Sequence, residues 1–293
     1  MKALPYTALA AFIGFTHANA ALTSGLVAYY NFDQAGAAGL VNHAPGASGT
    51  DASWTNAPVN GSTGFTGNAT FNPGNGISDR SSLLVGNAIN FVDGDGGNTI
   101  RVLLPFSSAD LGQSFSISMW HYLAPGVDNL SNRYQAIEAA NNYDVSWGTD
   151  SSYSSNADYV GYAETAKGTE LLGILEETWN HVVLQYDLTS NSTLNVYVNG
   201  TLRDTVTDTS GTFSFTGLHL GGSRDGSVAA IGDRDWDGMM DEVALWDRSL
   251  TSDEVTSLYN AGLSGIAVTA VPEPSSAALL GLSSLGLMLR RRR

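Results

Sequence analysis

The chain has 293 residues, with 28 acidic and 13 basic side chains and no cysteine. Its formal net charge of −15 argues against nucleic acid as a partner, because a protein that neutralises phosphates needs a basic surface. Without cysteine there are no disulfide bonds, so an exported form depends on its hydrophobic core, with bound metal as a further source of stability.

The first twenty residues have the three parts of a secretory signal. Lys2 supplies a positive charge, residues 4–15 are nearly all apolar, and Ala18-Asn19-Ala20 has the small-x-small form that signal peptidase cleaves. We therefore expect a signal peptide over residues 1–20, export by the Sec route, and a mature chain that starts at Ala21.

Most regular patterns after residue 21 predict β-strands. Short apolar or alternating segments bounded by turn-forming residues are typical of strands with at least one buried face. Asn199-Gly200, between two such segments, is the strongest short signal for a β-hairpin, because both residues tolerate positive φ. The predicted strands cover residues 26–32, 90–92, 99–104, 115–120, 181–186, 194–198, 201–206 and 241–246.

Two stretches contain few branched apolar residues, and we interpret them as loops. Residues 34–82 are rich in Gly, Asn, Ser and Ala, with at most a short strand over residues 65–71. Residues 141–167 also lack a regular pattern. Loops of this length more often form binding surface or variable decoration than core.

One helix is well specified near the end of the folded part. Thr251 and Glu254 have the spacing of a capping box, and Leu250 and Val255 occupy the hydrophobic-staple positions. Gly262 is a natural C-terminal stop, so the predicted helix covers residues 252–261. Together with the strands, this predicts an all-β fold, a two-sheet antiparallel β-sandwich with one short C-terminal helix.

The end of the chain has three parts in a fixed order. A proline-rich motif over residues 271–275 fixes an extended approach, and an uncharged apolar segment follows over residues 276–289. That segment is shorter than the ~20 apolar residues of a full span, which suits transient insertion into the inner membrane. The motif contains Pro272, Glu273 and Pro274, and the last four residues are Arg290, Arg291, Arg292 and Arg293.

This tail resembles the PEP-CTERM sorting signal of Gram-negative bacteria. The resemblance implies that a membrane protease of the exosortase type recognises the Pro-Glu-Pro motif and removes the tail. We therefore expect residues 266–293 to be a linker plus sorting signal. The expected destination is the cell surface or the extracellular space, with the protein held in the membrane before the tail is processed.

Three stretches of the body, in matching order and spacing, carry a second resemblance. They are residues 25–33 (GLVAYYNFD), residues 179–183 (WNHVV) leading to residues 194–200 (LNVYVNG), and residues 238–251 (GMMDEVALWDRSLT). These resemble the signatures of laminin-G-like (LamG), concanavalin A-like jelly rolls, especially the pentraxin-like group. The resemblance covers nearly all of residues 25–262 and implies one jelly-roll domain over residues 21–265.

The resemblance also implies a structural calcium ion, held by Asp33 after the first strand and by Asp241 of the Asp-Glu-Val motif. A second candidate is an acidic run whose alternating carboxylates are typical of the first half of an EF-hand loop, although Ala244 stands where the bidentate Glu would fall. Each candidate could instead be a solvated acidic turn. The run contains Asp233, Asp235 and Asp237.

Catalysis has no support in the sequence. Related jelly-roll glycosidases carry a Glu-x-Asp-x-x-Glu cluster on one strand, and this chain has none. Glu176 and Glu177 are adjacent and would point to opposite faces of a strand. Nothing in the sequence places a serine or an aspartate around a histidine, so we expect no enzyme.

Sugar binding is the better supported activity. Aromatic side chains on loops stack on sugar rings, and several tyrosines and a tryptophan lie in the irregular region after residue 141. Any one of them could equally belong to the core. The residues expected to contact ligand are Tyr143, Trp147, Tyr153 and Tyr159.

The sequence thus predicts an exported, non-catalytic surface or matrix protein whose jelly roll binds carbohydrate, such as an extracellular polysaccharide, and is stabilised by calcium. The alternative is an adhesion or structural module that binds protein partners. A glycoside hydrolase is the third interpretation.

Overall fold

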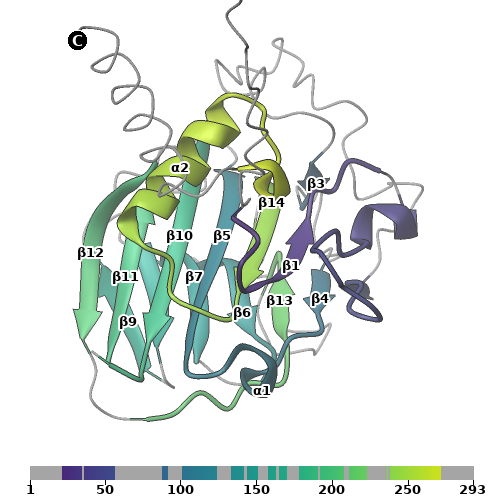
Figure 1. Ribbon diagram of the computed structural model, residues 1–293. Coiled ribbons are helices and arrows are strands. Elements are labelled where there is room, and N and C mark those ends of the chain that lie inside the picture. The colour runs from purple at the N-terminus through teal and green to yellow at the C-terminus, as the bar shows by residue number, and fades with distance from the viewer. Residues whose placement is uncertain are drawn as a thin grey trace, which may run out of the picture.

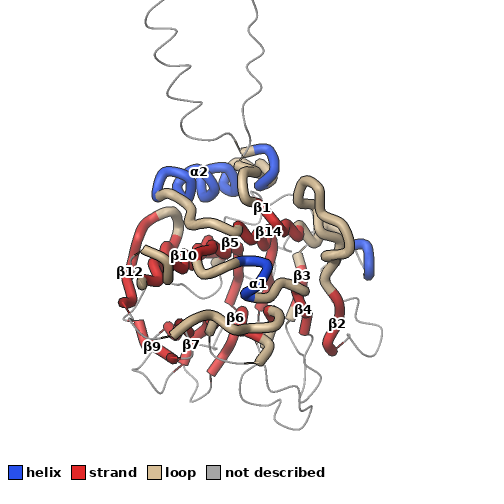
Figure 2. The backbone as a smooth tube through the Cα atoms, turned by 60° about the horizontal axis from the view of Figure 1, so that its bottom comes forward, coloured by secondary structure: helices blue, strands red, loops and turns tan. Residues whose placement is uncertain are grey.

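Two antiparallel sheets stacked face to face form the described part of the molecule, and the helix α2 lies across the outer face of the first sheet (Figures 1 and 2). The computed structural model describes residues 22–34, 36–56, 88–91, 101–123, 133–141, 144–150, 158–162, 165–169, 178–190, 192–207, 211–222, 236 and 238–271. None of the helices in these ranges has the length and apolar character that a membrane crossing requires.

The first sheet has the strand order β1-β14-β5-β10-β11-β12, and β3 also pairs with β14. Its strands are β1 (Leu26–Tyr30), β3 (Ile89–Asn90), β5 (Ser114–Leu123), β10 (Trp179–Asp187), β11 (Thr193–Val198), β12 (Thr201–Thr207) and β14 (Gly238–Trp246). The second sheet has the order β2-β4-β13-β6-β7-β8-β9. Its strands are β2 (Ser53–Asn56), β4 (Arg101–Leu104), β6 (Arg133–Ala139), β7 (Val145–Asp150), β8 (Asp158–Tyr162), β9 (Thr165–Thr169) and β13 (Leu218–Leu220).

Four short or medium helices complete the described elements. They are η1 (Gly36–Leu40), α1 (Ser108–Leu111), α2 (Ser252–Leu263) and η4 (Val268–Ala270), of which η1 and η4 are 3₁₀ helices. This architecture confirms the predicted all-β sandwich with a helix near the C-terminus and is consistent with a jelly roll.

Alternation along each strand builds the core between the sheets. In β5, Phe115, Ile117 and Met119 point into that core. Trp120 and Tyr122 point to the other face of the first sheet. Successive side chains of a strand point to opposite faces, so β5 places one set of apolar side chains in the core and the other set on the face that α2 covers.

The hairpin of β11 and β12 confirms the prediction from Asn199-Gly200. Both turn residues have positive φ, at 51° and 76° respectively, as a type I′ turn requires. The Asn199 side-chain oxygen also accepts the His181 backbone N–H at 3.0 Å, which ties the turn to the neighbouring strand β10. The local sequence therefore fixes both the turn and its place in the sheet.

The interpretation of residues 141–167 as loops is wrong, because β7, β8 and β9 lie within or across them. In β7 the core side chains are Val145 and Trp147, and the residues between and after them are Ser146 and Gly148. With so few apolar positions, the strand pattern is weak in the sequence. The strand β2 and the helix η1 likewise lie within the predicted loop over residues 34–82, while its residues 65–71 lie outside the described residues.

Gly262 does not end the helix, which continues to Leu263. A Cβ atom at Gly262 would lie 2.6 Å from both Cζ2 and Nε1 of Trp120, so glycine is required there by the close approach of α2 to the first sheet. The chain turns away only at Gly265, where φ is +65°.

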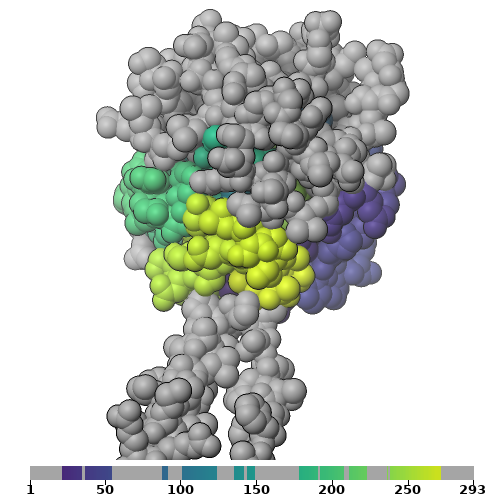
Figure 3. Space-filling model, turned by 90° about the horizontal axis from the view of Figure 1, so that it is seen from above, coloured from purple at the N-terminus to yellow at the C-terminus, as the bar shows by residue number. Residues whose placement is uncertain are grey.

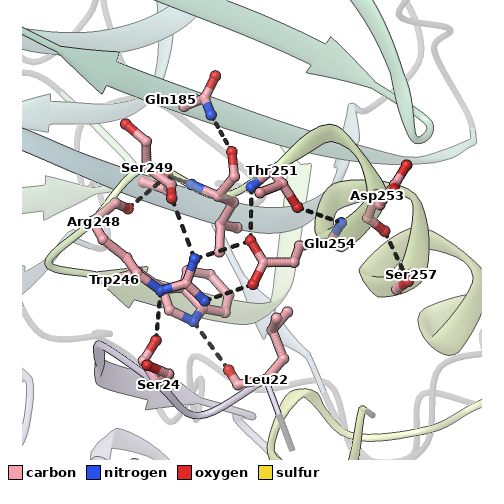
Figure 4. A network of polar contacts seen from close by, with 12 residues as sticks. Leu22, Ser24, Gln185, Trp246, Arg248, Ser249, Thr251, Asp253, Glu254 and Ser257 are labelled. Atoms are coloured by element: carbon pink, nitrogen blue, oxygen red, sulfur yellow. Dashed lines mark hydrogen bonds and ion pairs between the residues drawn. The ribbon is translucent and has the colours of Figure 1, made fainter. Parts of the chain in front are cut away.

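The start of α2 forms the predicted capping box (Figure 4). The Thr251 hydroxyl accepts the Glu254 backbone N–H at 3.2 Å, and the Glu254 carboxylate accepts the Thr251 N–H at 2.7 Å. Arg248 donates two hydrogen bonds to the same carboxylate, at 2.7 and 2.9 Å, and its Nε donates to the Ser24 carbonyl at 2.8 Å. These contacts bind the helix to the N-terminal segment.

The two ends of the described body meet on this side of the molecule. In Figure 3, residues near the C-terminus (yellow) lie beside residues of the N-terminal part (purple). The Leu22 N–H donates to the Val271 carbonyl at 2.6 Å, and Trp246 Nε1 donates to the Leu22 carbonyl at 3.1 Å. Leu22 and Val271 are both buried in the cluster that contains Val255 and Leu258 of α2. Both ends therefore belong to the outer face of the first sheet.

Candidate functional site

An acidic cluster lies where β1 and β14 pair. Asp241, wholly buried on β14, accepts the Glu242 backbone N–H at 2.8 Å through Oδ1. The Glu242 carboxylate accepts the Tyr29 hydroxyl at 2.9 and 2.8 Å and a backbone hydrogen bond from Val268. Asp33 follows β1, and its Oδ2 accepts the Asn31 amide at 2.6 Å.

Burial and mutual repulsion disfavour the charged forms of this cluster. Burial raises the pKa of Asp241 well above its usual value, and the negative charges of Glu242 and Asp33 add to the shift. Burial also raises the pKa of Glu242 to about 7, against the hydrogen bond from Tyr29. Burial and the charge of Glu242 raise the pKa of the Tyr29 hydroxyl. A nearby cation would reverse these shifts.

The carboxylates of this cluster are the type of ligand that calcium binds, but they are too few to fill its coordination shell. Carboxylate and carbonyl oxygens are the ligands that calcium prefers. Asp241 Oδ2 is buried and has no hydrogen-bond partner among the described residues, so it has an unused acceptor. In the described part of the chain, however, no three His, Asp or Glu side chains form a group that could hold a metal ion. Backbone carbonyls would have to complete the shell.

A serine–histidine pair, which the sequence did not reveal, lies under α2. Ser118 Oγ and His181 Nε2 are 2.9 Å apart, on the neighbouring strands β5 and β10. The imidazole packs against the rings of Trp120 and Tyr259, with centroid distances of 5.1 and 6.1 Å. Burial lowers the pKa of His181 to about 3, so the pair is a neutral, enclosed contact.

The other candidate residues fall into three groups. Trp147 is wrong as a loop contact for ligand, because it is only 1% exposed and packs in the core between the sheets. Tyr159 lies in β8, opposite Gly148 of β7. The rest lie outside the described residues: Tyr143, Tyr153, Asp233, Asp235, Asp237, Pro272, Glu273, Pro274, Arg290, Arg291, Arg292 and Arg293, together with the expected signal peptide.

Two family models match the sequence. The model of the concanavalin A-like lectin/glucanases superfamily matches residues 93–256. The model of the PEP-CTERM protein-sorting motif matches residues 270–293 and confirms the interpretation of the tail, which implies export and processing by an exosortase. The comparison with curated proteins found no match.

Several solved structures have a similar fold. Domain 4 of AbnA, an extracellular GH43 arabinanase from Geobacillus stearothermophilus solved with arabinotriose, has a TM-score of 0.53 at 16% identity and covers 80% of this chain and 98% of its own. Botulinum neurotoxin type C, whose cell entry depends on two ganglioside molecules, has a TM-score of 0.54 at 15% identity, covering 82% and 52%. The binding domain of neurotoxin DC with rat synaptotagmin II has a TM-score of 0.53 at 14% identity, covering 82% and 52%.

These structures show the shared fold, and the chain spans about half the length of the toxin chains that it matches.

Proposed function

Because the chain belongs to the concanavalin A-like lectin and glucanase superfamily, we propose that it is an exported, non-catalytic module that binds carbohydrate. The burial of its acid–base groups carries the proposal. Ser118, His181 and Asp241 are at most 1% exposed, so a substrate cannot reach these three groups. The sandwich therefore serves as a binding scaffold, at the cell surface or in the extracellular matrix.

The similar structures support the ligand class. The arabinanase domain was solved with an arabinose oligosaccharide, and the neurotoxin with the same fold depends on gangliosides. The sorting tail adds that the protein is exported. A protein partner is the second candidate, since a neurotoxin binding domain of this fold was solved with synaptotagmin II.

Screening the purified protein on immobilised plant and bacterial polysaccharides and on ganglioside-coated surfaces tests the proposal. Retention on at least one glycan, with no release of reducing sugar from it, is the expected result. Retention on none of them would overturn carbohydrate binding and favour a protein partner. Release of reducing sugar would overturn the non-catalytic assignment.

We also propose that Asp33 and Asp241 hold a structural calcium ion, which would supply the positive charge that the acidic cluster lacks. Thermal unfolding with excess calcium and with EGTA tests this, because a ligand of the native state raises stability by mass action. Calcium should raise the melting temperature of the native protein. Asp241→Asn should abolish that rise, whereas Asp253→Asn, at an exposed position of α2, should preserve it. An equal response in all three proteins would overturn the assignment.

A further inference from the structure

Residues 268–271 fold back onto the outer face of the first sheet, and we call them the strap. The Ile266 N–H donates to the Ala261 carbonyl at 2.9 Å, so the chain turns back directly after α2, and the helix η4 begins the strap. Val268 and Val271 are 6% and 2% exposed, and both belong to the hydrophobic cluster that includes the buried side chains of α2. The strap is therefore packed into the body.

Hydrogen bonds hold the strap at both of its ends. At its start, the Val268 N–H donates to the carboxylate of Glu242 on β14. At its end, the Val271 N–H donates to the Val268 carbonyl at 3.3 Å, and the Val271 carbonyl accepts the Leu22 N–H at 2.6 Å. Leu22 is fixed in turn, because it is 0% exposed and its carbonyl accepts Trp246 Nε1 at 3.1 Å (Figure 4). Leu22 thus joins the end of the strap to the first sheet.

The sorting motif begins at the residue where the strap ends. The motif covers residues 271–275, so Val271 belongs to both segments and Pro272 follows without a spacer. Proteins that bind a peptide as an extended strand use the backbone N–H and C=O groups of that peptide. Both groups of Val271 are already bonded within the fold, and its side chain is buried. While the strap is docked, an enzyme cannot take up Val271 as part of an extended substrate.

We propose that the strap is an autoinhibitory contact, which holds the start of the sorting motif in the fold until the strap is released and the exosortase-type protease can bind the tail. The inference depends on the processing that the motif implies and is independent of carbohydrate binding. Release does not require the sandwich to unfold, because segments at the ends of a domain open locally at a lower free energy than the core. The rate of processing then follows how often the strap opens.

Leu22→Ala tests the proposal, because it weakens the packing of the strap while the tail keeps its sequence. Truncating a buried leucine to alanine costs more free energy than a tenfold change in an equilibrium constant. The full chain is produced in a Gram-negative host that has an exosortase, and its processing is followed by pulse-chase labelling. The variant should lose its tail about tenfold faster than the native protein. Val268→Ala removes fewer carbon atoms, also lies outside the motif, and should act in the same direction more weakly.

Leu194→Ala is the matched control, because Leu194 is also a leucine with 0% exposure but lies in the core between the sheets. It should lower the melting temperature as Leu22→Ala does and leave the rate of processing near the native value. Hydrogen exchange of the purified full chain, read by mass spectrometry, gives a second measurement. In Leu22→Ala, the bonded amides of Val268 and Val271 should exchange about tenfold faster, while those of β5 and β10 should stay protected.

The other outcomes overturn the proposal in different ways. If Leu22→Ala and Leu194→Ala speed up processing equally, general destabilisation is the cause and the strap has no special part. If the strap exchanges faster in Leu22→Ala but processing keeps its native rate, the protease binds the tail with the strap still docked. If neither the native chain nor Leu22→Ala loses its tail in a host that processes its own PEP-CTERM proteins, the strap does not control processing. None of these results bears on the binding of glycans.

Discussion

Replacing Gly262 with alanine should destabilise the protein, although alanine is the better helix former. In the helix interior, alanine gains roughly 1 kcal/mol over glycine. The new Cβ would lie 2.6–2.7 Å from three atoms of the Trp120 ring. That ring cannot move aside freely, because it is 3% exposed and packs against His181 and Tyr259, at centroid distances of 5.1 and 5.8 Å.

Overpacking of this kind typically costs about 1–3 kcal/mol, so the free energy of unfolding should fall by up to about 2 kcal/mol after the propensity gain is subtracted. Urea unfolding should show a lower midpoint with an unchanged slope. Asn260→Ala, at an exposed position of the same helix, is the control and should raise the midpoint slightly. If Gly262→Ala also raised the midpoint, the close contact between α2 and Trp120 would be refuted.

Three further predictions concern the cap of α2, the turn between β11 and β12, and the dependence of stability on pH. Thr251→Ala should lower the free energy of unfolding by ~1 kcal/mol in urea, because the Glu254 N–H loses its cap. Asn199→Ala should cost about 1–2 kcal/mol in the same assay, because alanine disfavours positive φ, and Asn199→Gly should cost less. The buried histidines should weaken the fold in acid: burial lowers the pKa of His121 and His181 to about 3, so the unfolded state binds more protons at these two residues below pH 6.5, whereas the raised pKa values of Glu242 and Asp241 act in the opposite direction. Glu242→Gln removes the Glu242 contribution, so this variant should lose more stability than the native protein between pH 7 and 5 in circular dichroism melts, and an equal loss would contradict the reasoning.

The hairpin of the first sheet and the helix that covers this sheet could be predicted from the sequence, because the patterns that specify them are local. The hairpin of β11 and β12 depends on Asn199-Gly200, and the start of α2 depends on a capping box that spans four residues. Each signal is complete within a few positions of the chain. Such features can therefore be predicted without knowledge of the rest of the fold.

The second sheet was harder to predict, because its outer face is polar. Ser146 and Gly148 interrupt the apolar pattern of β7, which made a strand look like a loop. The same polarity made Trp147 look like an exposed aromatic residue, whereas its place between Ser146 and Gly148 puts it on the core face. A search for alternation around a single large aromatic residue could have found this strand.

Contacts between distant residues were beyond the reach of sequence patterns. Tyr29 and Glu242 are 213 positions apart, and their hydrogen bond exists only because β1 and β14 pair. Ser118 and His181 meet for the same reason, through the pairing of β5 and β10. Asp33 and Asp241 could be named in advance only through the family resemblance.

The two outer faces of the sandwich differ in a way that bears on how the protein is displayed. Leu22 and Val271 pack with α2 on the first sheet, and the sorting motif begins at Val271. The second sheet lies on the other side of the core from α2 (Figure 2). A protein held through its tail would therefore present α2 toward the membrane and the second sheet away from it.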